Sequence, residues 1–317
     1  MENSKYPLVS VVIPSYNGMP YLQAAIESVL AQDYPNVELI VLDDGSTDNT
    51  ARYLEQYKGQ FYFETHRNMG QAQTVNKGWQ MSKGQFIGYL SADDTLEPNA
   101  ISLSVQYLLE NPEVILTYGD NILINADSQP IRTLITKEFD FYQLFLESTT
   151  PVAVGSFFRR EGFETIGGWD KNFVQIGDYE FHLRLCQLGK FKRIPHILGC
   201  HRIHEESASY RKINFDRADE YVRLLSSQLA TTKDEKLLEI KDQILSQAYL
   251  ISGRTHWRSS RYKVGLKYFS KAFILNPKAL YAAKTYRIIL NAVLNRSLHA
   301  LLKKYKKTIN RLKRGNA

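Results

Sequence analysis

Residues 9–14 read VSVVIP, residues 37–42 read VELIVL and residues 85–90 read QFIGYL. Each run is short, apolar and rich in β-branched or aromatic residues, which is typical of a strand buried within a parallel sheet. The segments expected to be helices show apolar residues at helical spacing: 21–32, 47–57 and 71–81. Strands that alternate with helices predict an α/β fold with a mostly parallel sheet of βαβ units.

Polar clusters follow the predicted strands at the points where they end. They are Ser15-Tyr16-Asn17, Asp43-Asp44-Gly45-Ser46 and Asp93-Asp94. Ligands of such sheets bind beyond the carboxyl ends of the strands. We therefore expect the three clusters to lie at one functional edge of the sheet.

The adjacent carboxylates of Asp93 and Asp94 repel each other unless a cation lies between them. Mg²⁺ and Mn²⁺ take one or two carboxylates together with substrate phosphates, so the pair suits a metal–diphosphate site. A structural role is equally open, because residues 95–98 could begin a helix that this pair caps.

Asp43 and Asp44 also allow two interpretations. A carboxylate at a strand end can accept hydrogen bonds from a nucleotide base or a ribose hydroxyl, and the following helix N-terminus favours anions. Alternatively, the segment only caps the helix predicted at 47–57, with Ser46 or Thr47 as N-cap.

The rest of the chain divides into a body and a tail. Residues 99–110 are expected to form a helix, 115–128 a strand and hairpin turn, and 195–204 a last strand and loop. The pattern becomes helical from about residue 218, which predicts domains 1–215 and 216–317. Within the tail, residues 248–277 resemble one tetratricopeptide-type helix pair.

The tail is strongly basic. From Ala230 onward there are 20 Lys and Arg residues against four Asp and Glu. Residues 297–314 place leucines and other apolar residues on one helical face, with lysines and arginines around it. We expect this helix to lie on an anionic membrane surface, although a core-packing terminal helix would show the same apolar stripe. A nucleic-acid role is disfavoured.

Other signals place the chain in the cytoplasm. Its two cysteines, Cys186 and Cys200, form no CxxC motif, so a reducing compartment is expected. Neither a signal peptide nor an apolar run of membrane-spanning length occurs in the sequence. We therefore predict a cytoplasmic protein, attached peripherally at the inner face of the cell membrane if its basic tail binds lipid.

Several motifs, taken in order, resemble the family 2 glycosyltransferases of the GT-A fold. They are VSVVIPSYNG (9–18), VLDDGSTDNT (41–50), NMG (68–70), NKG (76–78), YLSADD (89–94), FETIGGWD (163–170), IGDYEFHLRL (176–185) and CHRIHEESAS (200–209). The resemblance extends over roughly residues 7–210. It implies an inverting, metal-dependent transfer of a sugar from a nucleotide-diphosphate donor, most simply a UDP-sugar, to a hydroxyl acceptor.

The resemblance also implies roles for individual residues. Those expected to bind the nucleotide-sugar are Pro14, Ser15, Tyr16, Asn17, Asp43, Asp44, Asn76 and Asp93. Asp94 and His204 would bind Mn²⁺ or Mg²⁺, and Asp178 would be the general base. Trp169, Asp170 and Glu180 would shape the donor and acceptor pocket.

Three positions depart from the family pattern. Gly177 stands where the family has the first Glu of a Glu-Asp pair, so Glu180 is the candidate to supply an acceptor contact in its place. Val75 replaces a frequent Arg, and His201 replaces a frequent aromatic residue. These departures are consistent with a distinct donor or acceptor.

Other functions fit less well. A nucleotidyltransferase would carry a glycine-rich loop with basic residues after the first strand, and a dehydrogenase would carry GxGxxG there. Residues 15–20 have one glycine and no basic residue. A degenerate transferase body that serves as a binding scaffold through its helical tail remains the alternative. As an enzyme, the protein would use a glycan or lipid-linked acceptor in the synthesis of surface polysaccharides, lipid-linked oligosaccharides or glycans.

Overall fold

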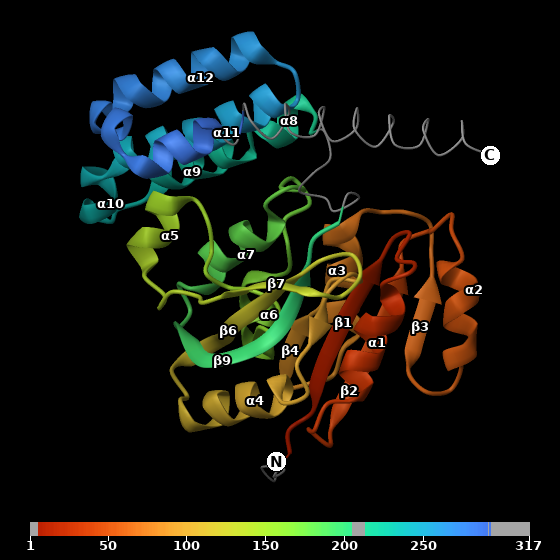
Figure 1. Ribbon diagram of the computed structural model, residues 1–317. Coiled ribbons are helices and arrows are strands. Elements are labelled where there is room, and N and C mark those ends of the chain that lie inside the picture. Colours follow the sequence, from red (N-terminus) through yellow and green to blue (C-terminus); the bar gives the residue numbers. More distant parts are fainter. Residues whose placement is uncertain (1–5, 205–212, 291, 293–317) are drawn as a thin grey trace, which may run out of the picture. The chain divides into compact units, whose positions relative to one another are not determined.

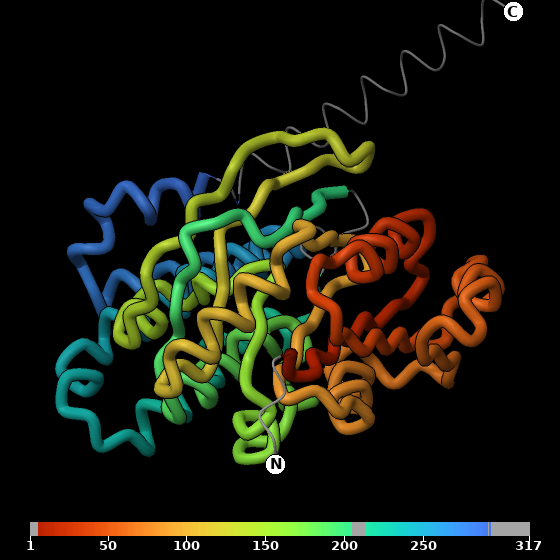
Figure 2. Tube along the Cα trace, turned by 90° about the horizontal axis from the view of Figure 1, so that it is seen from below, coloured from red at the N-terminus to blue at the C-terminus, as the bar shows by residue number. Residues whose placement is uncertain are grey.

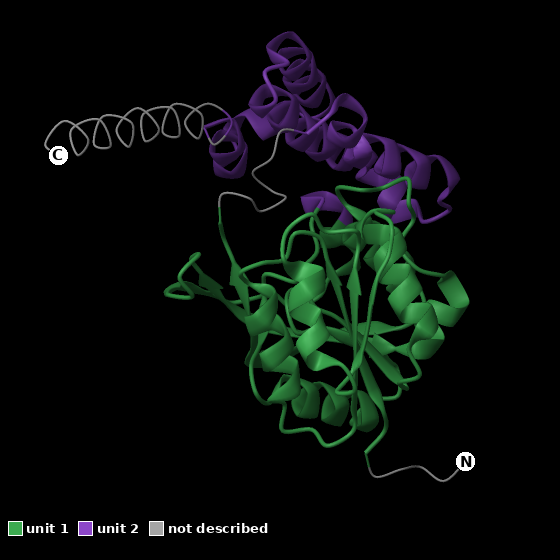
Figure 3. Ribbon diagram, turned by 90° about the vertical axis from the view of Figure 1, so that its right-hand side faces the viewer, with its two compact units in different colours: residues 1–144, 149–210 green, residues 145–148, 211–317 purple. Residues whose placement is uncertain are grey.

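The computed structural model describes residues 6–204, 213–290 and 292. The chain divides into two compact units (Figure 3). Unit 1 comprises Met1–Leu144 and Thr149–Tyr210, and unit 2 comprises Phe145–Ser148 and Arg211–Ala317. The main division therefore falls a few residues before the predicted boundary at 215, and one short internal segment groups with the tail.

Unit 1 is built on a sheet that has nine strands among the described residues, in the order β3-β2-β1-β4-β8-β6-β9-β5, with β7 paired to β6. The strands are β1 (Val9–Ser15), β2 (Val37–Asp43), β3 (Tyr62–Thr65), β4 (Phe86–Tyr89), β5 (Thr95–Leu96), β6 (Val114–Ile124), β7 (Pro130–Leu134), β8 (Phe157–Arg159) and β9 (Lys190–Arg202). The α/β fold predicted from the sequence is confirmed.

The sheet has two parts. Strands β3, β2, β1 and β4 pair in parallel, and β6 pairs in parallel with β9. Between these parts lies β8, which is antiparallel to both β4 and β6. Figures 1 and 2 show the red and orange N-terminal strands at one end of unit 1 and the yellow to green strands β6 and β9 at the other.

Helices cover both faces of this sheet. Those of unit 1 are α1 (Leu22–Leu30), α2 (Thr50–Leu54), η1 (Glu55–Tyr57), α3 (Gln71–Met81), α4 (Ala100–Glu110), α6 (Arg160–Ile166) and α7 (Gly177–Leu185), and α5 (Phe141–Glu147) runs from unit 1 into unit 2. Successive side chains of a strand point to opposite faces. Accordingly, Val11 and Ile13 of β1 pack in one core with α1 and α4, whereas Val12 packs in a second core with α3 and α7.

One expected helix start is wrong, and one alternative that the sequence left open is excluded. The helix predicted at 47–57 begins at Thr50 with Asn49 at its N-cap position, because Ser46 instead hydrogen-bonds to Asp43. Residues 95–96 form strand β5, which pairs with β9, and the next helix begins at Ala100. The capping interpretation of Asp93 and Asp94 therefore fails, while the predicted hairpin after residue 115 is confirmed as β6 and β7.

Unit 2 is helical in its described part. Its elements are α8 (Phe215–Ala218), α9 (Glu220–Thr231), α10 (Glu235–Glu239), α11 (Lys241–Arg258), α12 (Tyr262–Leu275) and η3 (Pro277–Tyr281). Helices α11 and α12 pack closely where Gly253 and Gly265 meet, since a Cβ on Gly253 would lie 2.9 Å from the ring of Phe269. This is the helix pair expected at 248–277.

The amphipathic helix predicted at 297–314 lies outside the described residues. Among the helices that the structure does describe, none combines the length and the apolar character needed to cross a membrane.

Candidate functional site

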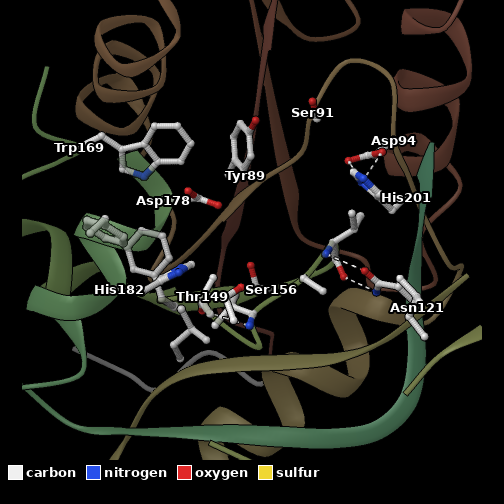
Figure 4. Close-up of a pocket in the computed structure, with 18 of the residues that line it drawn as sticks. Tyr89, Ser91, Asp94, Asn121, Thr149, Ser156, Trp169, Asp178, His182 and His201 are labelled. Carbon is white, nitrogen blue, oxygen red and sulfur yellow. Dashed lines mark hydrogen bonds and ion pairs between the residues drawn. The ribbon is translucent and has the colours of Figure 1, made fainter. Parts of the chain in front are cut away.

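A cavity of about 600 Å³ opens in unit 1 beside the carboxyl end of β4. Its lining includes Tyr89 at the end of β4 and Asp94 a few residues later. Trp169, Asp178 of α7 and His201 of β9 line the same cavity (Figure 4). The cavity thus gathers side chains that are far apart in sequence. Two of the predicted functional carboxylates, Asp94 and Asp178, line it.

The Asp93-Asp94 pair is divided between two histidines. Asp94 is buried, and its Oδ1 accepts a hydrogen bond of 2.8 Å from the backbone N–H of Arg202. His201 Nδ1 lies 3.3 Å from the same oxygen. His204 Nε2 instead lies 3.0 Å from Asp93 Oδ2. The structure therefore places His201, and not the predicted His204, beside the carboxylate of Asp94.

Electrostatics at this pair follow from burial. Loss of water around Asp94 raises the pKa of its carboxyl. The hydrogen bond with Asp94 raises the pKa of His201. An imidazole binds a metal ion only in its neutral form, so a cation at Asp94 would compete with the proton that this contact favours on His201.

A divalent cation at this pair would need further ligands from the substrate. In the described part of the chain, no group of three or more His, Cys, Asp or Glu side chains is arranged to hold a metal ion. Mn²⁺ and Mg²⁺ commonly bind through one or two protein carboxylates and complete their shell with substrate phosphates. Asp94 retains acceptor capacity beyond its bond to Arg202, so Asp94 and His201 fit a cation that arrives with a nucleotide diphosphate.

The carboxylate of Asp43 is bonded within the protein. The residue is fully buried, and its carboxylate accepts hydrogen bonds from the backbone N–H and hydroxyl of Ser46 and from Thr65. Asp43 thus holds the loop after β2 to the neighbouring strand β3, and its predicted role in nucleotide binding stays a prediction. Within the run at residues 43–46, the contact between Ser46 and Asp43 stabilises the loop.

Asp44 joins the same edge to the start of α3. Its Oδ1 accepts from the backbone N–H of Met69 at 2.6 Å, and Oδ2 accepts from Gly70 at 2.9 Å. Only 4% of the residue is exposed. Each carboxylate oxygen keeps a second lone pair, so Asp44 can still accept one bond from a ligand.

The residues at the end of β1 lie outside the cavity. Pro14 and Ser15 are buried, and Tyr16 is 47% exposed. Asn17, in the left-handed region with φ 52°, accepts a bond of 2.8 Å at its side chain from the backbone N–H of Thr47. Asn17 therefore binds the two strand-end loops together, and Tyr16 presents the accessible ring at this edge.

Asn76 fixes the loop that carries Trp169. Its Nδ2 donates to the carbonyl of Trp169 and its Oδ1 accepts from the N–H of Trp169, both at 2.8 Å. A Cβ on Gly168 would collide with that Oδ1, so the contact requires glycine. The amide of Asn76 is thus engaged by the protein backbone, and its predicted contact with the nucleotide-sugar stays a prediction.

Replacement of Asn76 by Ala is expected to lower the free energy of unfolding by about 1–3 kcal/mol, because it removes two hydrogen bonds and leaves the Trp169 backbone groups partly unpaired. Urea unfolding of the full chain measures this. Gln80→Ala, which removes an exposed amide from the same helix, is the matched control. Equal destabilisation by both variants would contradict the role of the Asn76 bridge.

Asp178 lies in the first turn of α7 and faces the cavity (Figure 4). Its Oδ1 accepts from the backbone N–H of Tyr179 at 2.8 Å. The side chain reaches the solvent of the cavity, but the surrounding protein displaces enough bulk water to raise the pKa of its carboxyl. A carboxylate with a raised pKa in a cavity is suited to accept a proton.

Glu180, the candidate to replace the carboxylate that the family has at position 177, forms an ion pair with Arg184. It is 4% exposed, and its two oxygens accept from Arg184 at 2.5 and 2.6 Å. Arg184 in turn donates to the carbonyl of Gly168 at 2.7 Å. Through Arg184, Glu180 thus anchors the Trp169 loop, and it is not among the residues that line the cavity; its predicted acceptor contact stays a prediction.

Asp170 stabilises a turn after Trp169. Its Oδ1 accepts from the backbone N–H of Asn172 at 2.9 Å and its carbonyl accepts from Phe173, which closes a turn after Trp169. Of the three residues predicted to shape the donor and acceptor pocket, only Trp169 lines the cavity.

Other lining residues had no predicted role. Asn121 of β6 holds the segment before β8, since its side chain donates to the carbonyl of Val154 and accepts from its N–H, both at 2.9 Å. A polar pair within the apolar run of residues 114–124 was the sequence signal for it. Tyr89 and His182 also line the cavity.

Comparisons with known proteins agree with this architecture. The family model described as Glycosyl transferase family 2 matches residues 10–167. Hyaluronan synthase of Pasteurella multocida is 28% identical over 225 residues, which are 69% of this chain and 23% of that protein. Chondroitin synthase of Pasteurella multocida strain Pm70 is also 28% identical, over 69% of this chain and 23% of its own length. The chain thus spans about a quarter of these relatives.

Solved structures show the same fold at low identity. Staphylococcus aureus TarS 1-349 in complex with UDP-GlcNAc aligns with a TM-score of 0.60 and 13% identity, covering 86% of this chain and 91% of that one. A mannosyltransferase from Pyrobaculum calidifontis in complex with GDP-Man and Mn²⁺ aligns with a TM-score of 0.59 and 18% identity, covering 96% and 82%.

Proposed function

The chain belongs to glycosyl transferase family 2 through residues 10–167, and from this premise we propose that it is an inverting enzyme that moves a sugar from a nucleotide diphosphate to an acceptor hydroxyl. The observation that carries the proposal is the joint position of Asp178 and Asp94 on one cavity. One carboxylate can accept a proton there, while the other serves the diphosphate end of the donor.

The proposed reaction is a single displacement. Asp178 accepts the proton of the acceptor hydroxyl as the hydroxyl oxygen bonds to the anomeric carbon of the donor sugar. The bond between that carbon and the diphosphate oxygen breaks in the same step, and the nucleoside diphosphate leaves. The raised pKa of Asp178 favours this proton transfer, because a stronger base shares the proton more readily in the transition state.

Asp94 and His201 would hold the divalent cation together with the donor diphosphate. When bound, the cation neutralises the charge that develops on the leaving diphosphate. The backbone N–H of Arg202 fixes one oxygen of Asp94, and so orients its carboxylate toward that task. His204 and Asp93 form the adjacent pair, where Asp93 is available to the donor ribose or sugar.

The donor is proposed to be a UDP-sugar and the acceptor a glycan or lipid-linked saccharide in polysaccharide synthesis. The relatives named as hyaluronan and chondroitin synthases and the TarS structure with UDP-GlcNAc support this class. Attachment to an anionic membrane through the basic tail is part of the same proposal, with the cytoplasm as its compartment. A degenerate scaffold is disfavoured, because both cavity carboxylates remain in place.

The proposal is tested by release of nucleoside diphosphate from a panel of UDP- and GDP-sugars with Mn²⁺, with water as the acceptor. We expect release from a UDP-sugar, its loss on addition of EDTA, and its return when Mn²⁺ is restored in excess. No release from any donor would reject the transferase proposal. Release that persists in EDTA would reject the metal assignment while keeping the transfer activity.

A further inference from the structure

His182 occupies an unusual position on the wall of the cavity. It is only 8% exposed, and its ring lies 6.0 Å from that of Phe181 and 5.8 Å from that of Phe191. Its Nδ1 is buried and has no hydrogen-bond partner among the described residues. His182 is thus a polar ring among aromatic side chains, and no internal hydrogen bond at Nδ1 explains why a histidine occupies this position.

Packing alone does not explain this residue. A buried polar atom without a partner is unfavourable, and an apolar side chain of similar size would avoid that cost. Burial lowers the pKa of His182 to about 3, so the ring is neutral at physiological pH. A neutral imidazole offers one donor and one acceptor, which is the hydrogen-bonding pattern that a sugar hydroxyl complements.

The position of His182 relative to Asp178 indicates which substrate it meets. The two residues are four apart on α7, so they share one face of that helix, and both line the cavity. Figure 4 shows His182, with Thr149 and Ser156 near it, well separated from Asp94 and His201. In the proposed reaction the diphosphate lies at Asp94, and the acceptor lies on the side of the base, Asp178. His182 is on the Asp178 side, so it would meet the acceptor.

We propose that His182 and the neighbouring hydroxyls of Thr149 and Ser156 form a subsite for the acceptor, in which the imidazole binds a hydroxyl of a hexopyranose. This inference rests on the proposed transferase function. The rings of Tyr89 and Trp169, which are only partly buried, also line the cavity, and they provide an apolar surface for the C–H face of the sugar ring. His182 is then a residue that selects the acceptor, and Asp178 remains the base.

The test uses full-length protein, Mn²⁺ and the UDP-sugar whose hydrolysis is fastest. Methyl glycosides of glucose, galactose, N-acetylglucosamine and glucuronic acid are added, and acceleration of UDP release gives a KM for the glycoside beside the KM for the donor. His182→Phe removes both nitrogens, and His182→Gln keeps a polar group at a similar reach. His196→Phe, at an exposed histidine of β9, is the matched control.

We expect at least one glycoside to accelerate UDP release. His182→Phe should then raise the KM for that glycoside about tenfold or more relative to any change in the KM for the donor, and His182→Gln should restore most of the difference. His196→Phe should change neither value.

Three results separate the possibilities. Absence of UDP release from the unmodified protein rejects the transferase function itself. Release that no glycoside accelerates rejects a hexopyranose subsite. If a glycoside accelerates release but His182→Phe leaves the ratio of its KM to the donor KM unchanged, the role of His182 is rejected. A melting temperature for each variant shows that folded proteins are being compared.

Discussion

Replacement of Asp178 by Asn is expected to slow sugar transfer by about 10²–10⁴-fold, because it removes the carboxylate that accepts the proton of the attacking hydroxyl. The amide has nearly the same shape, and its oxygen can still accept from the N–H of Tyr179. The loss should therefore appear in kcat while the KM for the donor changes little. Steady-state measurement of UDP release with an accelerating glycoside gives both constants.

The same variant has an expected effect on stability. The pKa of Asp178 is raised in the folded protein, so the folded state binds this proton more tightly than the unfolded state does. The carboxylate opposes folding once the pH exceeds its unfolded pKa of about 3.9. Asp178→Asn should therefore melt at or above the temperature of the unmodified protein at pH 7, with a difference that disappears below about pH 4.

The pH profile of transfer provides a second measurement. Since the base must be ionised, transfer by the unmodified protein should fall as the pH is lowered through the raised pKa of Asp178, above the range of an ordinary aspartate. Asp127→Asn, at the exposed tip of the hairpin, is the charge-matched control and should retain transfer. Full activity in Asp178→Asn would place the base elsewhere.

Asp94→Asn is expected to reduce metal-dependent turnover by about 10²–10³-fold, which is the scale observed when one preorganised electrostatic group is removed from an active site. The asparagine oxygen can still accept from the N–H of Arg202, so the loop before β5 should keep its conformation. What is lost is the negative charge available to a cation that arrives with the donor diphosphate.

Binding of the cation can be measured apart from catalysis. The paramagnetic resonance signal of free Mn²⁺, titrated against protein in the presence of UDP, gives the dissociation constant directly. We expect Asp94→Asn to weaken Mn²⁺ binding by at least about tenfold. Equal Mn²⁺ affinity in both proteins would remove Asp94 from the metal site, whatever the effect on turnover.

The fold could be predicted well from the sequence where the residue pattern is local. The β-branched runs at β1 and β2 and the helix at α3 lie where the periodicity placed them. The antiparallel strand β8 could not be recognised, because three residues are too short to show a period of two. Its partners β4 and β6 are also distant in the sequence.

The candidate site was predictable in part. Asp94, Asp178 and Trp169 were named from motifs, and the structure brings all three to one cavity. Asp43, Asn76 and Glu180 belong to the same motifs but bind backbone groups or Arg184. A motif records that a residue type is needed at a position; only the structure shows whether the partner is a ligand or the chain itself.

His201 and His182 illustrate a second limit. His201 stood out in the sequence only as a departure from the expected pattern, yet it lies 3.3 Å from Asp94 because β9 pairs with β5 directly after the carboxylate. The importance of His182 rests on an unsatisfied Nδ1, and no sequence pattern reports an unsatisfied atom. Contacts across the sheet, and polar atoms that such contacts leave unpaired, depend on tertiary structure.

The bond between Asn76 and the backbone of Trp169 joins α3 to a loop more than 90 positions later in the chain. Changes in the loop that carries Trp169 are therefore limited by a residue of α3. For protein engineering, residues 160–185 could be replaced by the matching segment of another transferase only under two conditions. The incoming segment must have glycine at position 168, and an amide must be kept at position 76. The Trp169 loop and α3 are thus segments that have to be transplanted together.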